Sequence, residues 1–204
     1  SESDAPPSFI PNELLRNFTQ SSYDEFHQNA IEQRTTLGIG QSQDMTSLFY
    51  FWCYYLRENF IKEMYDEFLQ LAREDVAENQ HYGIECFFRF CSYGLEKRWD
   101  ENIFLQFQNE ALDDYHRGST YGLEKVKAFL IHNKHEFEIH ATPEMEEVLK
   151  QFPTLESFKK SNTPNFSPKR QEARSIPKYR QLGTPENNNR PKRGGHQRNN
   201  PKTD

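Results

Sequence analysis

The sequence predicts an all-α protein, a HEAT-like α-solenoid built from three helix-turn-helix repeats of about 39 residues each. A motif of Tyr, Gly, an aliphatic residue and Glu at 82–85 returns at 121–124. Around both copies apolar residues recur with the helical period of about 3.6 residues, and no segment shows strand alternation of useful length. A repeat of this length with two helices per copy is typical of α-solenoids, whose stacked repeats share one core.

The three copies cover about residues 20–58, 62–100 and 101–138. The spacing between Tyr23 and its counterpart Tyr65 is longer than the spacing that separates the other equivalent positions, so the first copy carries a three-residue insertion. The turn at 37–40, which contains two glycines, is the natural place for it.

Each copy contains two helices joined by a short polar turn. In the second copy, the positions of the first helix that follow the helical period are Met64, Phe68, Leu71, Ala72 and Asp75. The second helix runs over 82–98. A closing helix over 143–158, with Pro143 in its first turn, is expected to cap the last repeat.

We expect three segments along the chain: a flexible N-terminus (1–11), the repeat domain (12–158) and a disordered basic tail (159–204). After residue 160, ten Lys/Arg and three Asp/Glu give a net charge of +7; the whole chain carries −6, so the part before it carries −13. The tail also holds six of the eleven prolines and few apolar side chains, which leaves little burial to offset the entropy of ordering it. Two interpretations of the tail stay open, non-specific salt-sensitive contacts with RNA and a solvated linker to another domain.

Several classes of function are not expected. Three cysteines without CxxC spacing (Cys53, Cys86 and Cys91) predict buried, reduced thiols, and neither a disulfide framework nor a zinc site. No apolar run reaches the roughly 18 residues of a membrane helix and no signal peptide is recognisable, so we expect a cytoplasmic protein. We also expect a monomer. Without a glycine-rich phosphate loop, HExxH or GxSxG motif, we expect no enzyme, cofactor or metal ion, and we interpret His132 and His135 as non-ligating histidines.

The second helix of each copy presents a face that its core does not need. In the second copy, the core stripe on a helical wheel is Ile84, Phe87, Phe88, Cys91 and Leu95. The opposite face carries Arg89, Ser92, Tyr93, Glu96 and Lys97. The equivalent positions are Tyr50, Tyr54 and Arg57 in the first copy, and Ala128, His132 and His135 in the third. Because stacked repeats align equivalent faces, these residues are expected to form one continuous surface.

Flat rings interleaved with cations fit a single-stranded nucleic acid, whose bases stack while its phosphates pair with Arg and Lys. Glu96 does not suit a pure phosphate groove, but its carboxylate can accept hydrogen bonds from the N1–H and N2–H₂ of a guanine. If that guanine is methylated at N7 and cationic, ring stacking gains a cation–π contribution. The alternative is an ordinary solvated helix face.

Four segments of the sequence resemble the C-terminal tandem-repeat region of La-related protein 1: LGIGQSQDM (37–45), FW (51–52), RFCSYGLEK (89–97) and YGLEK (121–125). The resemblance spans about residues 12–158. It implies a HEAT-like fold that binds the 7-methylguanosine cap and first cytidine of mRNAs with a 5′-terminal oligopyrimidine tract, and that blocks the cap-binding initiation factor.

The resemblance also implies roles for single residues. Tyr93 would be one ring of a sandwich around 7-methylguanine, and Glu96 would read the Watson–Crick edge of that base. The remaining implied contacts are Arg89 and Ser92 to the first nucleotide, Tyr54 to the cytidine, and Arg57 and Lys97 to phosphates.

Two positions depart from the family pattern. His132 stands where the family usually has the second sandwiching tyrosine, and Tyr50 stands where it usually has an arginine placed for the triphosphate bridge. We therefore expect cap binding that is weaker or shifted in sequence preference. A different class of function stays open, a helical scaffold that binds basic proteins through its acidic surface and has lost or weakened cap binding.

Overall fold

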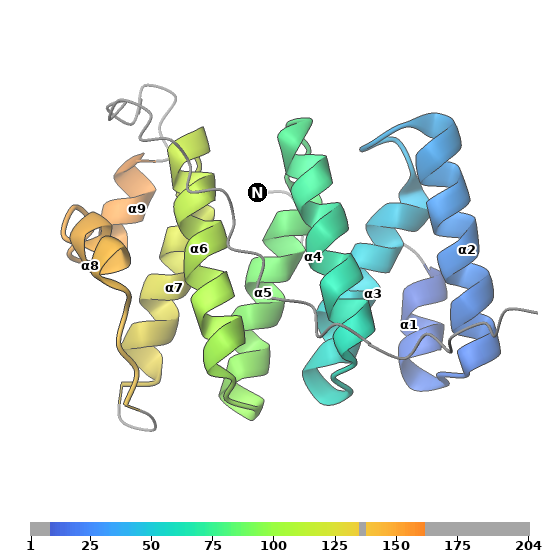
Figure 1. Ribbon diagram of the computed structural model, residues 1–204, viewed down its shortest axis with the longest axis horizontal. Coiled ribbons are helices and arrows are strands. Elements are labelled where there is room, and N and C mark those ends of the chain that lie inside the picture. Colours follow the sequence, from blue (N-terminus) through green and yellow to red (C-terminus); the bar gives the residue numbers. More distant parts are fainter. Residues whose placement is uncertain (1–8, 135–137, 162–204) are drawn as a thin grey trace, which may run out of the picture. The chain divides into compact units, whose positions relative to one another are not determined.

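The computed structural model describes residues 9–134 and 138–161, and the rest of the chain, which includes most of the expected basic tail, lies outside the described residues. Within these ranges every regular element is an α-helix and the helices follow one another in chain order (Figure 1). Their bounds are α1 Phe9–Arg16, α2 Gln20–Leu37, α3 Gln43–Glu58, α4 Lys62–Ala77, α5 Tyr82–Lys97, α6 Glu101–Arg117, α7 Tyr121–His132, α8 Pro143–Leu149 and α9 Glu156–Ser161.

The helix pairs α2–α3, α4–α5 and α6–α7 are the three predicted repeats, so the HEAT-like fold class is confirmed. The second helices α3, α5 and α7 pack side by side, and each first helix packs against the second helix of its own repeat. The turns repeat as well. Asn79 after α4 and Gly118 after α6 stand at equivalent positions of their repeats, and both have positive φ, 61° and 105°, the conformation that commonly ends a helix.

Two sequence-based boundaries differ from the structure. A helix already begins at Phe9, inside the segment 1–11 that we expected to be flexible. The single closing helix expected over 143–158 is wrong, because α8 ends at Leu149 and a separate helix, α9, begins at Glu156. The reason is Pro153, which lacks an N–H and disfavours helical conformation at the residue before it.

Interlocked pairs of phenylalanine and glycine set the spacing between repeats. A Cβ atom built on Gly83 would lie 2.8 Å from Cζ of Phe49, and one built on Gly122 would lie 2.7 Å from Cζ of Phe88. The two pairs occupy equivalent positions of successive repeats, and each joins two consecutive second helices. The glycines of the repeated Tyr-Gly motif therefore admit the phenylalanine of the preceding repeat.

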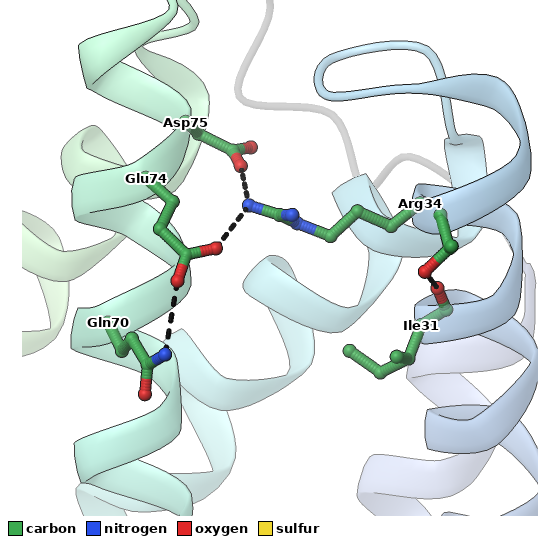
Figure 2. Close-up of polar contacts among 6 residues, drawn as sticks. Ile31, Arg34, Gln70, Glu74 and Asp75 are labelled. Atoms are coloured by element: carbon green, nitrogen blue, oxygen red, sulfur yellow. Dashed lines mark hydrogen bonds and ion pairs between the residues drawn. The ribbon is translucent and has the colours of Figure 1, made fainter.

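The first helices are tied together by ion pairs. Arg34 of α2 donates from Nη2 to Asp75 (2.7 Å) and to Glu74 (3.1 Å) of α4, as Figure 2 shows. Asp75, which the helical period placed with the core residues, is buried and pairs with this arginine. Burial raises the pKa of Asp75 and the guanidinium of Arg34 opposes that rise. One layer further, Nε of Arg73 donates to the buried Glu110 at 2.6 Å.

The three cysteines are buried and free, as the sequence predicts. Burial raises the pKa of all three thiols, that of Cys86 to about 12. Among the described residues, no group of three or more His, Cys, Asp or Glu side chains could hold a metal ion. None of the described helices is long and apolar enough to span a bilayer.

Candidate nucleic-acid interface

The nine residues predicted to bind RNA all lie on the second helices, and α5 contacts both α3 and α7. Tyr50, Tyr54 and Arg57 come from α3, His132 ends α7, and α5 supplies the others: Arg89, Ser92, Tyr93, Glu96 and Lys97. His135 and the residues after it up to 137 lie outside the described residues.

The face of α5 opposite the core is open to solvent at its C-terminal half. The Tyr93 side chain is 48% exposed and Tyr54 is 39% exposed, although both sit on helices rich in buried phenylalanines. Glu96, Lys97 and His132 are exposed, and the other members are half-buried: Tyr50, Arg57, Arg89 and Ser92. The helical wheel therefore separated the buried face from the accessible one correctly.

Arg57 lies between two of the predicted rings. Its guanidinium carbon is 4.2 Å from the centroid of the Tyr54 ring and 4.6 Å from that of Tyr93. Tyr54 belongs to the same helix as Arg57, whereas Tyr93 belongs to α5 of the next repeat. The guanidinium thus connects two aromatic rings across the repeat boundary.

Hydrogen bonds to the preceding turn hold Arg57 in this place. Nε donates to the backbone carbonyl of Cys53 at 2.7 Å, and Nη2 donates to the Sγ of the same residue at 3.1 Å. Sequence reasoning assigned Arg57 to phosphates and missed this stack. The wheel gives the angular position of Arg57 but not the direction in which its long side chain turns.

Tyr50 extends the row of rings on α3. Its ring centroid is 4.6 Å from that of Tyr54, with an interplanar angle of 41°. Burial, with a smaller contribution from Tyr54, raises the pKa of Tyr50 to about 12. The phenol is therefore neutral at physiological pH, and Tyr50 supplies ring area without charge.

Arg89 turns toward the N-terminal half of α5. Its Nη2 donates to Sγ of Cys86 at 3.3 Å, and its guanidinium carbon is 5.9 Å from the centroid of the Tyr82 ring. Cys53 and Cys86, one turn before Arg57 and Arg89, thus both accept from a predicted RNA-binding arginine. Because burial keeps these thiols neutral, both guanidinium charges remain uncompensated by them.

Glu96 is linked to the end of α7 by Asn133, a residue that sequence reasoning missed. Asn133 is 4% exposed; its Nδ2 donates to the carbonyl of Phe129 at 3.0 Å and to Oε1 of Glu96 at 3.4 Å. The buried amide, held at the helix end by Phe129, is thus a donor that reaches one oxygen of the Glu96 carboxylate. The only sequence signal for it is its place directly after His132.

Lys97 forms an ion pair with Glu58, the last residue of α3. Both side chains are at least half exposed, so water screens this pair and it is weak. Sequence reasoning missed Glu58, and it placed Lys97 against phosphates. In the described part of the chain no ring contact joins His132 to Tyr93, and their pairing stays a prediction.

The site therefore combines two accessible tyrosine rings, three cations and one carboxylate on the neighbouring helices α3 and α5, with His132 at the end of α7. Residues 9–156 match the family model described as the LARP1 HEAT repeat region. The match begins at the first residue of α1 and ends at the first residue of α9. It confirms the family resemblance seen in the sequence.

Proposed function

The chain belongs to the LARP1 HEAT repeat family, a La-related RNA-binding region, and from this we propose that it recognises the 7-methylguanosine cap and first pyrimidine of mRNAs with a 5′-terminal oligopyrimidine tract. The observation that carries the proposal is the exposed Tyr93 ring, which shares one face of α5 with Glu96. Asn133 donates a hydrogen bond to the carboxylate of Glu96. A ring and a carboxylate one turn apart on a helix can stack on a guanine and accept from its edge at the same time.

Tyr93 and Glu96 divide the recognition of the cap base. Stacking on Tyr93 does not discriminate among bases, since every base has a π-face. Methylation at N7 makes the guanine cationic, which strengthens its attraction to the ring. Glu96 supplies the discrimination, because a carboxylate accepts from the N1–H and N2–H₂ donors that guanine alone presents together.

The position of Arg57 limits how the base can approach Tyr93. Arg57 reaches the Tyr93 ring from α3, which packs on one side of α5, so one ring face is already covered. The other face is left for the cap base, and α7 with His132 packs on the other side of α5. A neutral His132 imidazole can complete the sandwich, whereas a protonated one would repel the cationic base.

The remaining residues are proposed to bind the first nucleotide and the phosphates. Tyr54 lines the pocket of the first pyrimidine, and Arg89 and Ser92 contact that nucleotide. Lys97 and Arg57 face the phosphates. Lys97 exchanges its ion pair with Glu58 for one with a phosphate, and breaking an exposed ion pair costs little free energy. Tyr50 provides ring area where an arginine would have provided charge.

Such a module has no catalytic role and acts as a monomer in the cytoplasm. By occupying the cap it excludes the cap-binding initiation factor and so regulates translation and stability of the bound transcripts.

The test is competition binding with capped and uncapped oligopyrimidine RNA of identical sequence, for the wild type and for His132→Tyr. We expect the wild type to prefer the capped RNA, and His132→Tyr to bind it more tightly because a phenol offers a larger ring. Equal affinity of the wild type for the two RNAs would contradict the proposal and favour the protein-binding scaffold.

A further inference from the structure

We infer that Arg57 is a positioning residue for Tyr93, whose ring it holds ready for the cap base and couples to the ring of the first nucleotide, Tyr54. The inference rests on the proposed function and changes the role of Arg57 from a phosphate contact to a layer of the base-binding stack. The coupling passes from one repeat to the next.

The first argument is the geometry of the guanidinium. A guanidinium is planar, so it can stack on two rings at once, and it does so here at 4.2 Å from Tyr54 and 4.6 Å from Tyr93. Its edge is fixed independently, because Nε and Nη2 donate to the carbonyl and the Sγ of Cys53. The Arg57 guanidinium is therefore engaged within the protein by two rings and two hydrogen bonds.

The second argument is the support around this stack. Tyr50 packs on Tyr54, so the row of planar groups runs from Tyr50 through Tyr54 and Arg57 to Tyr93. The neighbouring pair of Glu58 and Lys97 joins the same ends of α3 and α5. The stack is thus anchored on α3 and only its last ring, Tyr93, belongs to α5.

The consequence for binding is preorganisation. Tyr93 is 48% exposed, and an exposed tyrosine without this contact would lose side-chain entropy each time a base stacked on it. Arg57 already restricts the Tyr93 side chain in the free protein, so this entropy is lost before a base binds. A base on Tyr54 and a base on Tyr93 would then share one rigid support, so the cap and the first nucleotide help each other to bind.

The experiment uses a ligand without phosphate, so that a role as phosphate contact has no effect. 7-Methylguanosine, the free nucleoside, is titrated by NMR into the wild type, Arg57→Lys and Arg57→Gln. Lysine keeps the charge but not the planar group, and glutamine keeps a smaller planar group without charge. The control is Lys62→Gln in α4, which removes an exposed cation that lies outside the proposed binding residues.

We expect Arg57→Lys to weaken nucleoside binding about two- to fivefold, the size of one exposed cation–π contact. We expect Lys62→Gln to leave nucleoside binding unchanged. In the absence of ligand, Arg57→Lys should shift the ring resonances of Tyr93 while its melting temperature stays that of the wild type. Arg57→Gln separates charge from shape and serves if the lysine variant is poorly folded.

Two outcomes are distinguishable. If the wild type binds the nucleoside and both Arg57 variants bind it equally well, or if the Tyr93 resonances do not move, the positioning role is wrong while the proposed function stands. If the wild type does not bind the nucleoside, the proposed function and this inference fail together.

Discussion

Tyr93 occupies a position where a soluble helix ordinarily places a polar residue. Its neighbours along α5, Cys91 and Leu95, are fully buried, whereas the Tyr93 ring stays about half exposed and is contacted by Arg57. A large ring that stays about half exposed gives up about half of the free energy that it would gain in the core. The accessible part of the ring contributes little to stability, and it is the part that the proposed stacking on a ligand requires.

Replacing Tyr93 with alanine should remove most cap-dependent binding and leave the fold intact. Loss of one base-stacking ring costs about 1–3 kcal/mol of binding free energy. Because the ring fills no core volume, the melting temperature should hardly change. The comparison is Phe88→Ala, which empties a fully buried site and should destabilise the protein by about 3–5 kcal/mol. A similar loss of stability in Tyr93→Ala would show that the ring is structural.

The buried thiols should be inert in the folded protein. Alkylation requires the thiolate, and burial raises the pKa of Cys86 to about 12 and also raises those of Cys53 and Cys91. Iodoacetamide at pH 8 should therefore leave the native protein unmodified and label all three cysteines in guanidinium chloride, as mass spectrometry would show. Labelling of the native protein at the denatured rate would contradict the burial.

The same thiols should make the fold sensitive to alkali. Their folded-state pKa lies above the ordinary value of 9.0, so the unfolded chain releases these protons first. Their contribution to stability is then complete below about pH 9 and is lost as the pH rises toward 12. Denaturant unfolding at pH 8 and pH 10 measures the difference, and the variant Cys86→Ala should show a smaller one.

At the scale of the helix, the packing of one repeat on the next depends on two glycines, Gly83 and Gly122. Gly122 admits the ring of Phe88 and lies close to the backbone of Ala111, and Gly83 admits Phe49 in the same way. The glycine also weakens its own helix relative to alanine. The glycine is nevertheless needed, because it allows the close contact between second helices that aligns their accessible faces.

Gly122→Ala should therefore destabilise the protein despite the higher helix propensity of alanine. Its Cβ would lie 2.7 Å from Phe88 and 2.9 Å from the Cα of Ala111, and overpacking of this kind costs about 1–3 kcal/mol. Gly94→Ala in α5 is the control, because its nearest contact is the edge of the Phe90 ring at 3.2 Å and none lies under 3.0 Å. Thermal unfolding of both variants tests this prediction. Equal stability of Gly122→Ala and Gly94→Ala would show that the Phe88 contact adjusts without penalty.

The helical period and the spacing of the repeats determine which way a residue faces, and this was sufficient for the fold. They placed Phe88 in the core and Tyr93 on the accessible face, and both assignments agree with the observed burial. They did not reveal the break between α8 and α9. There Pro153 interrupts a pattern of apolar residues that otherwise reads as continuous.

The site was predictable only as a set of positions. A wheel cannot tell that Arg57 folds back onto Tyr54 and Cys53, since the outcome depends on rotamers and on the ring supplied by the next repeat. Nor can it tell that Asn133 reaches Glu96, because those residues come from different repeats. Sequence periodicity does not predict such interactions between repeats, because they depend on how the side chains pack in three dimensions.

At the scale of the whole molecule, charge is divided between the two ends of the chain. The residues after 160 carry a net charge of +7 and those before it carry −13. An acidic domain repels a polyanion at a distance and depends on its local cations for binding. A basic segment attached to it would supply a general attraction for RNA that is independent of the cap.

Truncation after Ser161 tests this division, since it keeps α1 to α9 and removes ten Lys/Arg and three Asp/Glu. We expect unchanged thermal unfolding and an unchanged ratio of affinities for capped and uncapped RNA, because the proposed cap site lies on α3, α5 and α7. Total RNA affinity should fall, and its dependence on salt should become shallower, since each cation that contacts a phosphate releases counterions on binding. The comparison is made over a salt series with the same oligopyrimidine RNA. An unchanged salt slope would show that the basic segment does not contact RNA, and a lower capped-to-uncapped ratio would show that it belongs to the cap site.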